Sequence, residues 1–238
     1  MRECWGIDGC RAGWLAIRCN PPDFRIFESA DALANLIDNA DSVWIDIPVG
    51  LSKAADRRCD QQLRNALGKA GSSVFLPPVR AAVYADDYEQ ACTINERLTG
   101  KRISKQAWNI TAKIRQVDEI LSARRKRIHR VFESHPEYLF MLMNQRRPLP
   151  SKKTEKGVKH RLNILEKIKP AFNELIWRIR KKHPKSQVAD DDIIDAMILA
   201  AAADMGLRQI KRIGSFPETP ESDERQIPMA IHYILPME

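Results

Sequence analysis

Apolar residues along the first fifty positions follow two different spacings. Short, largely apolar runs at residues 4–8, 14–18 and 24–27 have the length and the glycine- or proline-containing borders of strands. At 29–39 the apolar positions recur every three or four residues, which predicts an amphipathic helix. A nearly continuous apolar run at 43–47 follows. The order predicts three strands, a helix and a buried fourth strand, hence a mixed sheet in which the helical crossover makes strand four parallel to a neighbour.

The middle of the chain is polar and helical in pattern. Helices are predicted at 57–67, 86–98 and 104–122, and a loop containing glycine, serine and proline is predicted at 71–80. We interpret this region, about 52–127, as a helical insertion into the core fold.

The second half returns to the core. The predicted elements are a strand at 128–133, a basic helical segment at about 138–185, a strongly apolar helix at 190–206 and a final strand at 230–235. Pro170 separates two helices of the basic segment, and Gly206 is predicted as the C′ residue that ends the apolar helix. We therefore expect a single α/β domain over 1–238, built on a mixed five-stranded sheet flanked by helices.

Composition narrows the class of protein. The 238 residues are 44% hydrophobic, which suits one large globular domain. No apolar run approaches the roughly 18 residues of a membrane span, and the N-terminus lacks the apolar stretch of a signal peptide, so a cytoplasmic protein without membrane association is expected. The five cysteines are odd in number and lack C-x-x-C spacing, which predicts reduced core thiols.

The net charge of +8 hides a strong asymmetry. Residues 101–185 contain 24 Lys and Arg against seven Asp and Glu, whereas the remainder contains 15 basic and 24 acidic residues. Lysine and arginine displace condensed counterions from phosphates, so nucleic acid is the expected partner of the basic part. A set of solvated helix faces is the alternative.

Three acids end predicted strands. Asp8 stands between apolar and glycine residues at the end of the first strand, Asp46 lies within the fourth apolar run, and Glu133 ends the strand at 128–133. Ordinary turn or loop roles are the alternative for each. Because an unpaired buried carboxylate costs several kcal/mol, acids in such surroundings are expected to gather around a cation.

Further acids open the apolar helix. Asp190 and Asp191 can be explained as caps of its N-terminus. Asp195 lies a turn further in and shares a face with Asp192, so a functional role is predicted for this pair.

Carboxylates from strand ends and a helix suit two hard divalent ions, Mg²⁺ or Mn²⁺. In such a site one ion activates the attacking water and the other stabilises the leaving oxygen of a phosphodiester, so no protein nucleophile is required. The pattern is typical of a metal-dependent phosphodiester enzyme.

Five motifs follow one another along nearly the whole chain: Gly-Ile-Asp8-Gly-Cys-Arg-Ala-Gly-Trp14, Asp46-Ile-Pro-Val-Gly-Leu51, Ser73-Val-Phe-Leu-Pro-Pro-Val-Arg80, Glu133-Ser-His-Pro-Glu137 and Lys152-Lys-Thr-x-x-Gly157-x-x-x-Arg161. In this combination the chain resembles domain of unknown function 429, a family of predicted ribonuclease-H-like nucleases. The strand order with Asp8, and Asp192-Ile-Ile-Asp195-Ala, also resemble the ribonuclease-H-like superfamily, particularly its Holliday-junction resolvase branch.

The resemblance implies a ribonuclease-H-like fold and a set of metal ligands, namely Asp8, Glu133, Asp192 and Asp195. Asp46 is a fifth acid that replaces or supplements Glu133, because relatives carry one acid on either the fourth or the fifth strand. The resemblance also implies a set of substrate phosphate contacts, namely Arg80, Lys152, Lys153, Thr154 and Arg161. A surface role is the alternative for these five.

We therefore expect a nuclease whose activity depends on Mg²⁺ or Mn²⁺. One alternative is a non-catalytic nucleic-acid-binding protein on the same fold. Another is an ATP-dependent phosphotransferase, although the chain has no P-loop G-x-x-x-x-G-K-[ST]. Resolvase-like cutting of branched DNA would require a homodimer.

Overall fold

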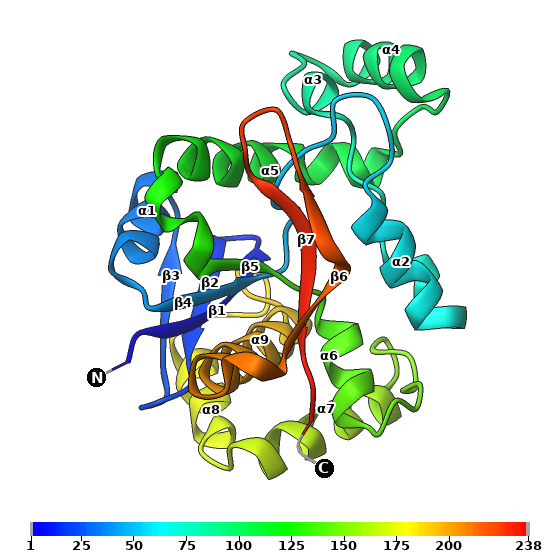
Figure 1. Cartoon of the computed structure of the whole chain (residues 1–238). Coiled ribbons are helices and arrows are strands. Elements are labelled where there is room, and N and C mark those ends of the chain that lie inside the picture. The colour runs from blue at the N-terminus through cyan, green and yellow to red at the C-terminus, as the bar shows by residue number, and fades with distance from the viewer. Residues whose placement is uncertain (1, 237–238) are drawn as a thin grey trace. The chain divides into compact units, whose positions relative to one another are not determined.

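The chain folds into two compact units (Figure 1). The computed structural model describes residues 2–236. Within them, the sheet unit contains the chain up to Asp46, His129–Gly214 and the residues from His232 onward. The helical unit contains Ile47–Ile128 and Ser215–Ile231. The predicted insertion at about 52–127 falls inside the helical unit, which also includes a C-terminal segment that the sequence pattern did not assign to it.

A five-stranded sheet is the framework of the sheet unit. Its strands are β1 (Cys4–Cys10), β2 (Gly13–Arg18), β3 (Asp23–Phe27), β4 (Ser42–Ile45) and β5 (Val131–Glu133). They lie in the order β3-β2-β1-β4-β5. Strands β1, β2 and β3 are antiparallel, whereas β4 is parallel to β1 and β5 is parallel to β4. The predicted mixed five-stranded sheet is confirmed.

Helix α1 (Ala30–Asn39) makes the crossover between β3 and β4. The Ser29 hydroxyl caps it by accepting from the Ala32 amide at 3.2 Å. Leu33 and Ile37 lie on its buried face. The crossover returns the chain to the same end of the sheet, so β4 runs parallel to β1, as the sequence predicted.

Helix α9 (Asp190–Arg208) packs on β1 and β4. A Cβ built on Gly6 of β1 would stand 2.1 Å from the backbone nitrogen of Ala200 and 2.3 Å from the carbonyl oxygen of Ala196. Only glycine leaves room for a helix backbone at this distance. The absent side chain at Gly6 therefore sets how closely α9 lies on the sheet.

Helix α9 extends beyond its predicted end. The prediction that Gly206 terminates it is wrong, because the helix continues to Arg208 with Gly206 inside it. A Cβ at Gly206 would stand 3.1 Å from the Ile213 side chain and 3.3 Å from the Trp44 ring. The glycine therefore serves close packing rather than helix termination.

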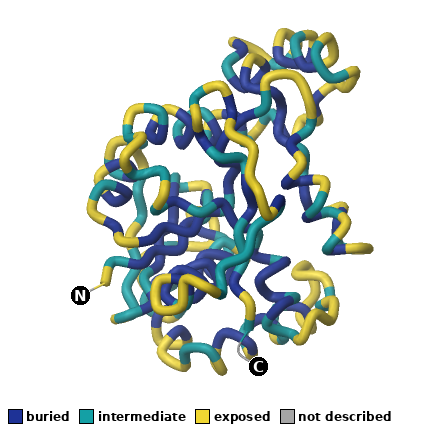
Figure 2. Tube along the Cα trace, viewed as in Figure 1, coloured by how far each residue is buried: buried dark blue, intermediate teal, exposed yellow. Residues whose placement is uncertain are grey.

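Three further helices surround α9 in the sheet unit: α6 (Pro136–Met143), α7 (Glu155–Ile168) and α8 (Phe172–Lys182). The last two confirm the helices predicted on either side of Pro170. Their apolar faces join α9 in one core that includes Trp44, Phe140 and Phe172. Figure 2 shows this core as the buried parts of the sheet and of α9. Short 3₁₀ turns connect the larger elements: η2 (Arg125–Arg130) and η3 (Ile210–Arg212).

The helical unit contains α2 (Arg58–Leu67), η1 (Gly68–Ser73), α3 (Arg80–Val83), α4 (Tyr88–Thr99) and α5 (Lys105–Ala123). The three predicted helices correspond to α2, α4 and α5 within two residues at each end. The predicted loop at 71–80 contains the end of η1 and reaches the start of α3. A small core of its own, which includes Val79 and Cys92, lies among α3 and α4.

Most of a two-stranded ribbon, β6 (Ile213–Ser222) and β7 (Pro228–Ile234), also belongs to the helical unit. The strand β7 was predicted at 230–235. The strand β6 was missed, because Pro217 and Pro220 argue against a strand in a sequence pattern.

All five cysteines are buried and free, as predicted. Among residues 2–236 no helix is long and apolar enough to cross a membrane.

Replacing Gly6 by alanine is expected to lower the free energy of unfolding by about 3 kcal/mol, because the new methyl group would meet backbone atoms of α9 that cannot rotate away. Thermal unfolding followed by circular dichroism measures this loss. Gly100→Ala is the control, since a Cβ there meets nothing within 4 Å and its φ of +74° adds only about 1 kcal/mol of strain. A Gly6→Ala protein as stable as the wild type would show that α9 does not lie so close.

Candidate functional site

The parallel strands bring two of the predicted acids to neighbouring positions. Ile7 of β1 lies opposite Ile45 of β4, so Asp8 and Asp46 come next on adjacent strands. The Asp46 amide donates to the carbonyl oxygen of Ile7 at 3.1 Å and extends the ladder by one residue. The two acids therefore share the carboxyl edge of the parallel strands, where open α/β sheets bind ligands.

Helix α9 brings a third acid to this edge. Side chains two residues apart on a strand share a face, so Asp8 faces the same way as Gly6. Ala196 of α9 lies against Gly6, and Asp195 directly precedes it. Asp195 is buried and close enough for its charge to raise the pKa of Asp8.

The gathered acids repel one another. Burial, followed by the charges of Asp46, Asp195 and Asp192, raises the pKa of Asp8 well above its ordinary value. Burial, together with the charges of Asp195 and Glu133, raises the pKa of Asp46 to about 8. Burial also raises the pKa of Asp192 and that of Asp195. The cluster therefore lacks compensating positive charge and favours protons or cations.

Glu133 approaches the cluster from a different direction. It pairs with Ile45 across β4 and β5, and alternation along a strand turns the side chain of the next residue, Asp46, to the other face. Glu133 is buried and its charge still reaches Asp46. The register thus favours Asp46 as the acid that shares a face with Asp8, and ligation by Glu133 stays a prediction.

The first turn of α9 divides its acids between different partners. Asp192 accepts from the Ala189 amide at 2.8 Å and so caps the helix with one carboxylate oxygen. Asp190 forms ion pairs with Arg180 at 2.7 Å and Lys185 at 2.6 Å. The interpretation of Asp190 and Asp191 as caps is wrong, because Ala189 is the N-cap residue and its amide bonds to Asp192. Ligation of a metal by Asp192 stays a prediction.

Lys152, predicted as a phosphate contact, lies at the acid cluster. Its Nζ is 2.8 Å from Asp195 Oδ2 and 3.7 Å from Asp191 Oδ2. Burial alone lowers the pKa of Lys152, but the carboxylates of Asp195, Asp191 and Asp8 outweigh burial and raise it overall. The lysine is therefore charged and supplies part of the missing positive charge.

The structure corrects the expectation that Arg161 contacts substrate phosphate. Its side chain is 1% exposed, and Nη2 donates to both carboxylate oxygens of Glu137 at 2.8 and 2.6 Å. Nη1 donates to the carbonyl oxygens of Pro150 and Gly157, each at 2.9 Å. Arg161 therefore joins α6, α7 and the loop before α7.

The neighbouring predicted contacts also differ in role. Thr154 caps α7, since its hydroxyl accepts from the Gly157 amide at 3.1 Å and donates to the Ser151 carbonyl oxygen at 2.8 Å. Contact of Thr154 with phosphate stays a prediction. Lys153 is exposed, and its contact with phosphate stays a prediction.

Arg80 lies in the helical unit and is buried. Its guanidinium pairs with Asp118 at 3.1 Å and also with Asp223. Arg225 pairs with the same Asp118 at 2.7 Å. A buried arginine matched by two carboxylates stabilises its own unit, which corrects the prediction that Arg80 binds phosphate.

His135, part of the Glu133 motif, has a neutral imidazole. Burial and the nearby Lys152 charge lower its pKa to about 4. Among the described residues its buried Nδ1 has no hydrogen-bond partner. In the sequence, only the position of His135 near the candidate ligand Glu133 indicated a role at the site. Its proximity to Lys152 could not be predicted.

The chemistry of the acid cluster fits a hard cation, but its geometry is not that of a formed metal site. Carboxylate oxygens are the ligands that Mg²⁺ and Mn²⁺ prefer, and burial together with the neighbouring acids raises the pKa of Asp8 and of Asp46. Within residues 2–236, however, no group of three or more His, Cys, Asp or Glu side chains is arranged to hold a metal ion. Ion binding would require the side chains to move.

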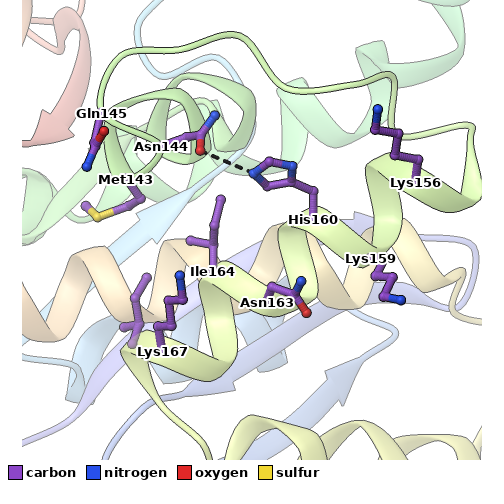
Figure 3. Close-up of a pocket in the computed structure, with 10 residues that line it drawn as sticks. Met143, Asn144, Gln145, Lys156, Lys159, His160, Asn163, Ile164 and Lys167 are labelled. Carbon is purple, nitrogen blue, oxygen red and sulfur yellow. Dashed lines mark hydrogen bonds between the residues drawn. The ribbon is translucent and has the colours of Figure 1, made fainter.

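A basic cavity of 510 Å³ lies along α7 and the end of α6. Lys156, Lys159 and Lys167 line it, and all three are exposed. Figure 3 shows His160 directed at Asn144, whose side-chain oxygen is 3.2 Å from its ring nitrogen. The sequence predicted a basic segment here but not these individual lysines.

Removing the Arg161 guanidinium should destabilise the protein rather than specifically weaken nucleic-acid binding. Arg161→Met would leave Glu137 and two carbonyl groups without their donor, and it should cost about 3 kcal/mol of unfolding free energy. Urea unfolding measures the loss. The matched control is Lys153→Met at an exposed position, which should change the unfolding free energy by less than about 0.5 kcal/mol. Unchanged stability with weaker nucleic-acid binding would restore the phosphate-contact role.

Comparison with known proteins gives one match. The model of the family described as "Protein of unknown function (DUF429)" matches residues 6–222. No curated protein and no solved structure gives a significant match. The family match includes most of β1 with Asp8, the Lys152 loop and all of α9. The chain therefore belongs to the DUF429 family.

Proposed function

We propose that the protein is a divalent-metal-dependent nuclease that hydrolyses phosphodiester bonds of nucleic acid. The observation that carries the proposal is the convergence of Asp8, Asp46 and Asp195 from two parallel strands and a helix. Asp195 is buried, Asp8 and Asp46 are half-buried, and the pKa of each is raised. Acidic side chains with a purely structural role are normally paired with positively charged groups or hydrogen-bond donors. This cluster has more negative charge than its neighbours neutralise, as a cation site would.

The sheet supports a ribonuclease-H-like assignment. Three antiparallel strands are followed by a helical crossover and two parallel strands, with α9 packed on the central strand β1. Acids stand on β1, after β4 and on α9, which supports three of the positions in the ligand set that the resemblance implies. We therefore propose this fold family for the sheet unit.

The chain's own residues would bind and orient the reacting groups. Asp8, Asp46 and Asp195 would hold Mg²⁺ or Mn²⁺, with Glu133 and Asp192 as further acids at the edge of the cluster. A divalent ion bound there would supply an activated water and offset charge on the phosphate. Water would attack the phosphorus, and the bond to the leaving sugar oxygen would break, so no protein nucleophile is needed.

The basic cavity supports a polyanionic substrate. Lys156, Lys159 and Lys167 lie on α7, whose first turn follows directly after the loop that brings Lys152 to the acid cluster. A strand with its scissile phosphate at the acids could continue along these lysines, which would contact its phosphates as point charges.

A non-catalytic nucleic-acid-binding protein is the second candidate. The ion pair between Lys152 and Asp195 favours it, because the Lys152 ammonium ion already neutralises one acid. In the part of the chain that the structure describes, moreover, no metal-holding group is formed. Binding without cleavage is the activity that this candidate predicts.

Replacing Asp8 by asparagine should lower metal-dependent cleavage at least about a hundredfold, because loss of a ligand charge removes several kcal/mol of transition-state stabilisation. Labelled single-stranded, duplex, hybrid and branched nucleic acids with Mn²⁺ provide the assay. Asp31→Asn, an exposed change on α1, is the control and should retain activity. Cleavage that persists in Asp8→Asn would contradict the proposed site, and binding without cleavage by the wild type would favour the second candidate.

Changing Lys156, Lys159 and Lys167 together to glutamine should weaken nucleic-acid binding and flatten its dependence on salt. The logarithm of the binding constant falls linearly with the logarithm of the salt concentration. Each lost phosphate contact should make this negative slope less steep by about 0.7 to 0.9. Fluorescence anisotropy over a salt series measures both quantities.

The matched control removes the same three charges elsewhere in the sheet unit. It changes the exposed Lys181, Lys182 and Lys211 to glutamine. Equal effects of the two triple variants would mean that only net charge matters and that the cavity lysines make no defined contacts.

A further inference from the structure

Lys152 is the cation that reaches the whole acid cluster. Its charge lowers the pKa of Asp8, Asp46 and Asp195 alike, opposing the larger effect of burial at each of them. The direct contact is a hydrogen-bonded ion pair of 2.8 Å with Asp195 Oδ2. The ammonium group thus lies against Asp195 at the solvent side of the acid cluster, with the lysine side chain 44% exposed.

The backbone around Lys152 is fixed on both sides. Before it, the carbonyl oxygen of Pro150 accepts from buried Arg161 at 2.9 Å. After it, Thr154 donates its amide and its hydroxyl to the Ser151 carbonyl oxygen at 3.0 and 2.8 Å. This loop is therefore held in place, unlike one that carries an ordinary surface lysine.

Gly157 shows how closely that loop is packed. A Cβ at this position would stand 2.0 Å from the carbonyl oxygen of Ser151, so only glycine lets α7 begin this near to the loop. Together with Thr154 and Arg161, Gly157 accounts for the Lys-Lys-Thr-x-x-Gly-x-x-x-Arg motif. The motif presents Lys152 to Asp195, and its arginine and threonine form internal hydrogen bonds with Glu137 and Gly157.

We propose that the Lys152 ammonium takes the place of one of the two divalent ions, so that the acid cluster binds a single Mg²⁺ or Mn²⁺. This inference rests on the proposed nuclease function and changes its cofactor requirement. An oxygen already bound to an ammonium ion is a poor ligand for a second ion, because two cations at such close range repel one another. The Asp46 oxygens, the Asp8 oxygen that does not accept from the Gly9 amide, and the other oxygen of Asp195 remain for one ion.

The proposal is tested by the number of Mn²⁺ ions that the metal-free full-length protein binds, without any assay of activity. Isothermal titration and the loss of the free Mn²⁺ electron paramagnetic resonance signal both count bound ions. The wild type should bind one ion. Lys152→Met should bind two, whereas Lys152→Arg, which keeps the charge, should still bind one. Lys153→Met is the neighbouring control and should bind one.

Circular dichroism establishes that each variant folds. Because Lys152→Met removes the partner of Asp195, Lys152→Gln serves as a second variant that can still donate a hydrogen bond, and it should also bind two ions. Two ions in the wild type, or one ion in either neutral variant, would overturn the proposal while leaving the nuclease function in place. No ion in any of these proteins would overturn both.

Discussion

The close contact between Gly6 and α9 is the constraint on which the rest of the sheet unit depends. Because Gly6 has no side chain, backbone atoms of Ala196 and Ala200 can occupy the space that a Cβ would need. The helix therefore lies directly on β1, and its first turns reach the carboxyl edge of the parallel strands. Asp195 meets Asp8 there as a consequence of packing, with no covalent or metal link needed to bring them together.

That contact also creates an electrostatic problem, which a second set of interactions reduces. Buried acids with raised pKa values oppose folding in their charged forms. The Lys152 loop brings an ammonium ion to Asp195, and Arg161 and Glu137 hold the loop in place. Residues from three motifs that are distant in the sequence, around Glu133, Lys152 and Asp195, thus contribute to one site.

Sequence pattern alone predicted the elements whose signals are local. Apolar spacing gave the five sheet strands and most of the helices, and acids at the ends of apolar runs indicated the cluster at Asp8, Asp46 and Asp195. The missed strand β6 has a local cause, its two prolines, whereas the other misassignments depend on a tertiary partner. The sequence predicts Gly206 as a helix terminator, whereas in the structure it allows close packing of α9 against Trp44 and Ile213.

The basic residues show the same limit more strongly. An arginine that binds phosphate and one that binds a buried carboxylate have identical sequence signatures, so Arg80 and Arg161 could not be distinguished from surface contacts before their partners Asp223 and Glu137 were known. The most direct test of the whole account is anomalous diffraction from crystals grown in saturating Mn²⁺. It should show an ion within about 2.5 Å of carboxylate oxygens of Asp8 and Asp195. Acids paired only with Lys152, and no anomalous peak among them, would contradict the claim that this cluster is a metal site.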